Sequence, residues 1–238
     1  MTKKKDNLAK KITSFSDNAI WTTYPLTVKW LQEQRKTMES FDIESIELHR
    51  GVNATIILLS AACLEGFLVD CLKSYVANNR FAARDTFEGR LDHDFLNRIS
   101  TATFNDFPDL FRLTLGNPLS ALISDTDLIE GIRTLINFRN GIAHARSVIH
   151  QSSIVEPEGD EDYEIEHQYH DVHKYLEGKN LIYGQQNLFS DKIADHFASL
   201  IKSYIDAVLP LIPTSQTMEL NMNVSLAYPA NKTKQVTK

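Results

Sequence analysis

An arginine, an asparagine and a histidine lie close together in the middle of the chain, at Arg139, Asn140 and His144. The guanidinium of arginine stays charged at physiological pH and offers a planar fork of N–H donors to oxyanions. The imidazole of histidine titrates near neutral pH, so it can give or take a proton. Together these groups could bind an anion and move a proton beside it, and no other stretch of the sequence is as suggestive of chemistry.

A carboxylate could complete this group. Glu65 interrupts an apolar stripe, since it follows Ala62 by three residues and precedes Val69 by four. Burying a charge without a partner is costly. Glu65 therefore forms a structural ion pair, lies at the rim of the core, or contributes to a site near Arg139 or His144, and the sequence leaves these alternatives open.

Three further histidines, His167, His170 and His173, form a second candidate group, which could bind a metal. His167 and His170 can share one helix face, and Glu164 or Glu166 could add an oxygen ligand, a set that suits zinc or another divalent cation. His173, however, lies about 240° from His167 around a helix, so the three cannot share a face. The preceding segment is acidic, and this favours a solvated charged surface over a metal site.

Two predicted helices carry the residues of the first group. Residues 52–78 show two neighbouring apolar stripes, which predict a central core helix that carries Glu65. Residues 128–136 show a narrower apolar face, which predicts a helix capped by Asp125 or Asp127 and leading to Arg139.

An unbroken helix would place Arg139 and His144 about 140° apart around its axis. Asn140 and Gly141 both tolerate left-handed backbone, so we expect a local break between them or a meeting of the two side chains through a second subunit.

The remaining helices are predicted from periodicity and from their caps. We expect them at residues 16–38, where Pro25 must fall near the start of the helix or break it, at 92–101, at 106–115 with a stop at Gly116, at 170–177, and at 190–209 behind a Ser190 cap. Short extended segments are expected at residues 180–183 and 224–227. No regular sheet is predicted.

The run Arg139-Asn140-Gly141-Ile142-Ala143-His144 resembles the signature of HEPN domains, in which an arginine and a polar residue are followed by a spacer and a histidine. Residues 61–68 are similar to an early core helix of such families, where an acidic residue can join the site. The likeness covers about residues 52–209 and leaves 151–184 unexplained. It implies an all-α, HEPN-like helical bundle with a partly irregular insertion between the motif helix and the last helix.

The resemblance also implies a metal-independent endoribonuclease. RNA cleavage through the 2′-hydroxyl needs a base for that oxygen, a cation for the charge on phosphorus, and an acid for the leaving 5′-oxygen. His144 would be the base or the acid and Arg139 would bind the phosphate. Asn140 would position the phosphate or support the turn, and Glu65 would orient His144 or pair with Arg139. No cofactor or metal is required by this scheme.

The resemblance bears on partners as well. Family members commonly bring two motifs together across a two-fold axis, so we expect a homodimer that holds an RNA substrate at a local basic site. A prokaryotic toxin–antitoxin or antiviral defence setting follows, with a neutralising or operon-encoded protein as a further partner. Because some such domains are not catalytic, a dimerisation or interaction module is the alternative.

The chain has 238 residues, of which 42% are hydrophobic and 24% charged, which is ordinary for a globular protein. We expect one helical domain at residues 16–212 with an insertion at 151–184, a loose basic arm at 1–15 and a polar tail at 213–238. A net charge of −6 argues against a protein that coats nucleic acid by bulk electrostatics.

No apolar stretch of the roughly 20 residues that a membrane span needs is expected, nor an N-terminal signal core, so the sequence favours a cytoplasmic protein without membrane contact. Cys63 and Cys71 lie eight positions apart in one predicted helix. Because about 12 Å of helix rise separates them, we expect two core thiols and no disulfide.

Overall fold

The computed structural model describes residues 19–38, 42–79, 87–143, 170–182, 188–213 and 217–229, and the regular elements within these ranges are all helices. The expected all-α fold is thereby confirmed. The labelled elements are η1 (Ile20–Thr23), α2 (Tyr24–Arg35), α3 (Ile43–Asn79), α4 (Phe87–Ser100), η2 (Phe104–Asp106), α5 (Phe107–Leu115), α6 (Leu119–Leu122), α7 (Thr126–Ala143), α9 (Asp191–Val208), η3 (Leu209–Leu211) and α10 (Thr217–Ala227). Residues 170–178 form a further helix.

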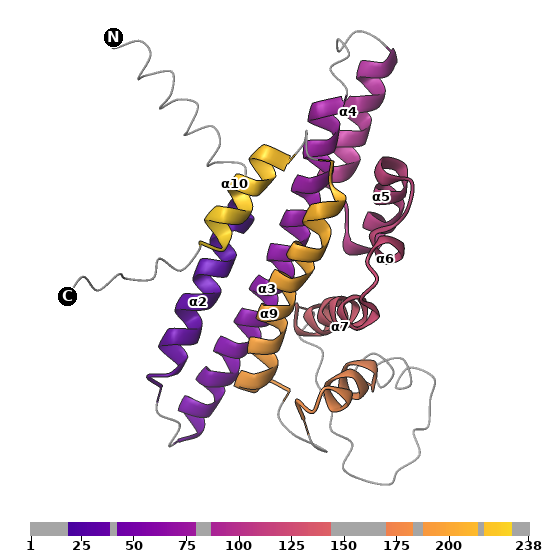
Figure 1. The fold of residues 1–238 in the computed structure, drawn as a ribbon. Helices are drawn as coiled ribbons and strands as arrows, with labels where there is room; N and C mark the ends of the chain where they lie inside the picture. The colour runs from indigo at the N-terminus through magenta and orange to yellow at the C-terminus, as the bar shows by residue number, and fades with distance from the viewer. Residues whose placement is uncertain are drawn as a thin grey trace, which may run out of the picture.

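Helix α3 is the centre of the bundle, as its two apolar stripes predict. It contacts α2, α4, α5, α7, α9, α10 and η1. Helix α9 runs beside α3 for most of the length of α9 (Figure 1). Leu64 and Phe67 are fully buried in it, and so are Ile56 and Ile57 on the preceding turns. A helix that is apolar around most of its surface must be surrounded by other elements, and that is the position of α3.

The length of α3 changes one sequence-based expectation. Ile43–Tyr75 is, among the described residues, the one helix that is long and apolar enough to cross a membrane by length and composition, and 56% of its most apolar window is buried inside the protein. The expectation that no apolar stretch reaches this length is therefore wrong. The same composition is what a central core helix requires.

Local signals determine where several helices begin and end. Pro25 lies in the first turn of α2 and Pro108 in that of α5, where a missing N–H leaves no helical hydrogen bond unmade. Gly116 ends α5 with a left-handed φ of 81°, and Asp125 accepts a hydrogen bond of 3.0 Å from the backbone N–H of Leu128 at the start of α7. Ser190 precedes α9 as expected, but its side chain makes no capping bond.

Helix packing around α7 depends on a close approach at Gly131. A Cβ atom at this position would lie 2.5 Å from the Tyr175 hydroxyl and 2.9 Å from Cδ2 of Leu200. Tyr175 belongs to the helix at 170–178, and its ring stacks on Phe197 of α9. The helix expected at residues 170–177 within the insertion is therefore present, and it packs against the core.

Two expected extended segments are not extended. Residues 179–181 form a turn in which Asn180 has a positive φ of 55°, whereas Tyr183 lies outside the described residues. Residues 224–227 belong to α10, which lies within the segment expected as a polar tail. Helix α10 packs on η1, α2 and α3 because Leu220, Asn223 and Ala227, spaced three and four residues apart, are buried on one face. The basic arm at 1–15 lies outside the described residues.

Both cysteines are buried free thiols, as expected. Cys63 and Cys71 lie on α3, and burial raises the pKa of Cys63 to about 12. Neither thiol is therefore ionised at neutral pH, and both act as small core residues.

Candidate functional site

Helix α7 carries Arg139 and Asn140 near its C-terminal end. The helix continues through Asn140 and Gly141 to Ala143, and neither residue has a left-handed backbone. The expected break between them is therefore wrong, because the apolar face of α7 keeps packing on α3 and α9 up to this point. His144 follows directly, but it lies outside the described residues.

Arg139 is held by residues on two helices. Its Nη2 donates a hydrogen bond of 2.5 Å to Oε2 of Glu65 on α3, and its Nη1 donates one of 2.8 Å to Oδ1 of Asn140. The structure thus brings together three of the four residues that the sequence singled out. Of the two contacts expected for Glu65, the one to Arg139 is formed.

The arrangement leaves the cation accessible. The side chains of Arg139 and Glu65 are 29% and 27% exposed, so the pair lies at the rim of the core. A guanidinium has five N–H donors, and two of those of Arg139 are used within the described part of the chain. Glu65 therefore orients the arginine and offsets part of its charge, while the other N–H groups of Arg139 bond to no described residue.

The histidine group is described only in part. His170 and His173 lie on the helix at 170–178, where His173 has its Nδ1 3.7 Å from Oε1 of Glu177. His167 lies outside the described residues. Within the described ranges no three His, Cys, Asp or Glu side chains are grouped so that they could hold a metal.

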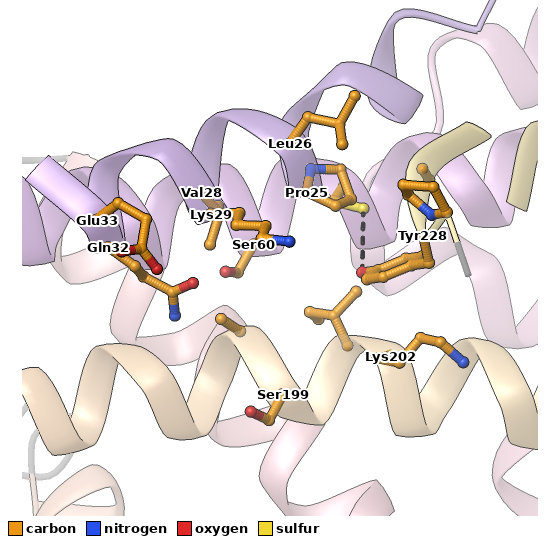
Figure 2. A pocket seen from close by; sticks show the side chains of 15 residues that line it. Pro25, Leu26, Val28, Lys29, Gln32, Glu33, Ser60, Ser199, Lys202 and Tyr228 are labelled. Carbon is orange, nitrogen blue, oxygen red and sulfur yellow. Dashed lines mark hydrogen bonds between the residues drawn. The ribbon is translucent and has the colours of Figure 1, made fainter. Parts of the chain in front are cut away.

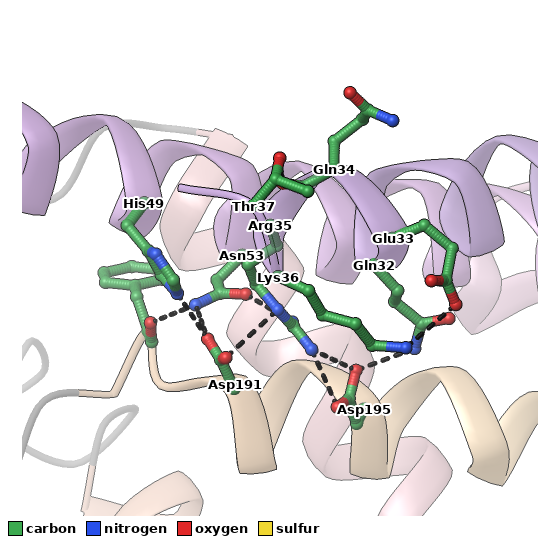
Figure 3. A network of polar contacts seen from close by, with 11 residues as sticks. Gln32, Glu33, Gln34, Arg35, Lys36, Thr37, His49, Asn53, Asp191 and Asp195 are labelled. Atoms are coloured by element: carbon green, nitrogen blue, oxygen red, sulfur yellow. Dashed lines mark hydrogen bonds and ion pairs between the residues drawn. The ribbon is translucent and has the colours of Figure 1, made fainter. Parts of the chain in front are cut away.

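A second polar cluster was not predicted from the sequence (Figure 3). Arg35 at the end of α2 is 4% exposed. Its Nη2 donates to both carboxylate oxygens of Asp195 at 2.8 Å, its Nη1 donates to Oδ1 of Asn53 at 2.7 Å, and its Nε lies 3.2 Å from Oδ2 of Asp191. His49 completes the cluster with a contact of 2.6 Å to Asp191.

This Arg35 cluster links α2, α3 and α9. Burial alone would raise the pKa of Asp191. Hydrogen bonds from Asn53 and His49 and the positive charge of Arg35 outweigh this effect, so the pKa of Asp191 is lowered. The Nη1 and Nη2 groups of Arg35 donate to protein groups and its Nε lies against Asp191, so the cluster is a structural clamp between helices. The spacing of Asp191 and Asp195 on one helix face was visible in the sequence, but their partner is about 160 positions away.

A separate cavity has none of Glu65, Arg139 and Asn140 in its lining, although Cys63, two residues before Glu65, contributes to it. It is a groove of about 570 Å³ between α2 and α9. Lys29 and Gln32 line one wall and Ser199 and Lys202 the other, as Figure 2 shows. At its floor the Cys63 thiol lies 4.0 Å from the Tyr228 hydroxyl. Because burial raises the pKa of the Cys63 thiol to about 12, this thiol is not an activated nucleophile.

The candidate site is therefore the surface around Glu65, Arg139 and Asn140, where α3 and α7 meet. Comparison with known proteins adds no assignment to it. No protein-family model, no curated protein and no solved structure matches this chain.

Proposed function

We propose that this protein is a metal-independent endoribonuclease of the HEPN type, which cleaves RNA through attack of the 2′-hydroxyl. Arg139, Asn140 and Glu65 would form the phosphate-binding part of its site, and His144 would supply proton transfer. The observation that carries the proposal is the contact between Glu65 on α3 and Arg139 on α7, which lie in the two segments that resemble HEPN domains.

In this proposal the reaction combines Arg139 as the cation with His144 as the group that transfers protons. A base removes the proton of the 2′-hydroxyl, the oxygen attacks phosphorus, and the bond to the 5′-oxygen breaks as an acid protonates it. The products are a 2′,3′-cyclic phosphate and a 5′-hydroxyl. Arg139 would stabilise the non-bridging oxygens of the transition state, since a guanidinium binds two oxygens in one plane.

In the proposal, Glu65 and Asn140 fix the orientation of Arg139 before substrate binds. A preorganised cation stabilises developing charge without having to reorient during the reaction. One His144 would act as the base and a second, from the partner of a homodimer, as the acid. We place the protein in the cytoplasm, in a toxin or defence setting with a neutralising partner.

The test is cleavage of single-stranded RNA in EDTA by wild type, Arg139→Ala, His144→Ala and Arg112→Ala. Arg112 is the matched control, because it is an exposed arginine that also pairs with a carboxylate, that of Asp109. Loss of Arg139 should slow cleavage about 10²- to 10³-fold and loss of His144 about 10²- to 10⁴-fold, with cyclic phosphate ends in the wild-type product.

Equal cleavage by all four proteins would remove the assignment. Cleavage that stops on chelation alone would contradict metal independence and direct attention to His167, His170 and His173.

A helical interaction module is the second candidate, and one observation favours it. Leu26 and Trp30 lie one turn apart on α2 with 46% and 59% of their surfaces exposed. Residues four apart share a helix face, and adjoining exposed apolar side chains are typical of contact surfaces. Two results together would favour the module. Wild type would form a dimer that dissociates on Trp30→Ser, as measured by light scattering, and wild type would not cleave RNA.

A further inference from the structure

Helix α7 has a second face that shares only Asn140 with the Arg139 site. Ile129, Arg133, Asn137 and Asn140 follow one another at steps of four, four and three residues, so they form one stripe along the helix. All four line a cavity of about 480 Å³. Its other side is formed by η2, α5 and α6, so the cavity lies between these elements and α7.

The wall opposite α7 is aromatic. Phe104, Phe107 and Phe111 line it, with the rings of Phe104 and Phe107 edge to face at a centroid distance of 6.2 Å. Phe107 and Phe111 are buried at 3% and 1% exposure, whereas Phe104 is only partly covered. The cavity can therefore receive a flat apolar ring against Phe104 without disturbing the core.

The α7 wall, by contrast, offers polar side chains that have donors or acceptors without a partner among the described residues. Within the described ranges no hydrogen bond is formed by the side-chain amide of Asn137, and Asn140 uses its Oδ1 for Arg139 while its Nδ2 makes no bond. Arg133 is exposed at the same wall and forms no ion pair with a described residue. The buried Asn53, in contrast, uses both ends of its amide. Partly covered amides without partners are groups that a ligand can satisfy.

We infer that this cavity binds the unpaired base of a nucleotide in single-stranded RNA, next to the phosphate held at Arg139. The inference rests on the proposed function. Carboxamides recognise the hydrogen-bonding edges of bases, and bases that are splayed out of a strand stack on aromatic side chains. Phe104 meets the face of the base, Asn137 and Asn140 its edge, and Arg133 a flanking phosphate.

Asn140 connects this pocket to the Arg139 site. Its Oδ1 accepts the hydrogen bond from Arg139, and Asn140 is also part of the cavity lining. A base in the cavity and a phosphate at the guanidinium are therefore neighbours along one strand. With a protein net charge of −6, a single base recognised at one pocket is a better source of affinity than many backbone contacts.

The experiment measures binding separately from cleavage. His144→Ala protein is titrated with a short single-stranded RNA, with the four ribonucleoside 5′-monophosphates and with ribose 5-phosphate, by calorimetry. The same titrations are made with Asn137→Leu and Phe104→Leu added. Asn221→Leu is the matched control, because Asn221 is exposed on α10 and is not in the cavity lining. Thermal unfolding by circular dichroism checks that each variant is folded.

We expect the RNA to bind about tenfold more weakly to Asn137→Leu and to Phe104→Leu, with Asn221→Leu unchanged. The monophosphates should bind more weakly than the RNA, and ribose 5-phosphate should not compete with them. Equal RNA binding by the folded Asn137→Leu and Phe104→Leu variants would overturn the inference, as would competition by ribose 5-phosphate. Monophosphates that bind as tightly as RNA would also overturn it, by assigning the cavity to free nucleotides.

These outcomes differ from failure of the proposed function. If the chain is not a nuclease, wild type does not cleave the RNA that it binds. If only the base pocket is wrong, wild type and Asn137→Leu cleave the same RNA at the same positions and rates.

Discussion

Arg35 provides the sharpest test of how the bundle is held together. The substitution Arg35→Met keeps a long side chain of similar reach but removes every N–H donor. It abolishes the hydrogen bonds to Asn53 and Asp195 and the ion pair with Asp191. The expected result is a large loss of folding free energy without a change of fold.

The magnitude follows from what the removed guanidinium leaves behind. Breaking a fully buried ion pair costs about 3–5 kcal/mol. Here Asp191 and Asp195 are 50% and 46% exposed, so water can hydrate them and the electrostatic loss falls below that range. Asn53 is 0% exposed and loses the partner of its oxygen, which costs about 1–3 kcal/mol. We therefore expect a total loss of about 3 kcal/mol.

Urea denaturation followed by circular dichroism measures this loss. The midpoint should fall with an unchanged slope, because the surface exposed on unfolding is nearly the same. Arg112→Met is the control, since Arg112 pairs with Asp109 at the surface and should change stability by no more than about 0.5 kcal/mol. A loss below about 1 kcal/mol for Arg35→Met, or an equal loss for both variants, would refute the clamp.

Two further predictions concern packing and pH. Gly131→Ala should destabilise the protein by about 1–2 kcal/mol, because a Cβ atom 2.5 Å from the Tyr175 hydroxyl forces a shift that outweighs the gain in helix propensity. Gly51→Ala is the control. A Cβ atom at Gly51 would have no other atom within 4 Å, so this substitution should raise the melting temperature. If both substitutions raise the melting temperature, the approach of Gly131 to Tyr175 is not a tight contact. Asp191 has a lowered pKa in the folded state, so its contribution is fully present above the unfolded value of 3.8 and is lost as pH falls through the folded pKa. Asp191→Asn should therefore be less stable than wild type at pH 7, and the difference should shrink below about pH 4 in urea titrations; a constant difference would exclude this linkage.

The sequence by itself determined the features whose causes are local. Apolar periodicity predicts α3, α7 and α9, and the left-handed Gly116 and the Asp125 cap mark helix ends, because each signal acts within a few residues of the chain. The same kind of reasoning misread 224–227 as extended. Its alternation is compatible with a strand, and only contacts with η1, α2 and α3 select the helix.

Tertiary structure decided which distant groups meet. The sequence left Glu65 with two candidate partners, and the packing of α7 against α3 brings it to Arg139. The sequence contained no signal that Arg35 would meet Asp191 and Asp195. An ion pair across about 160 residues depends on how two helices cross and not on the spacing of residues along either helix. The side-chain amides of Asn137 and Asn140 likewise became part of a cavity wall only when α5 and α6 were placed opposite α7.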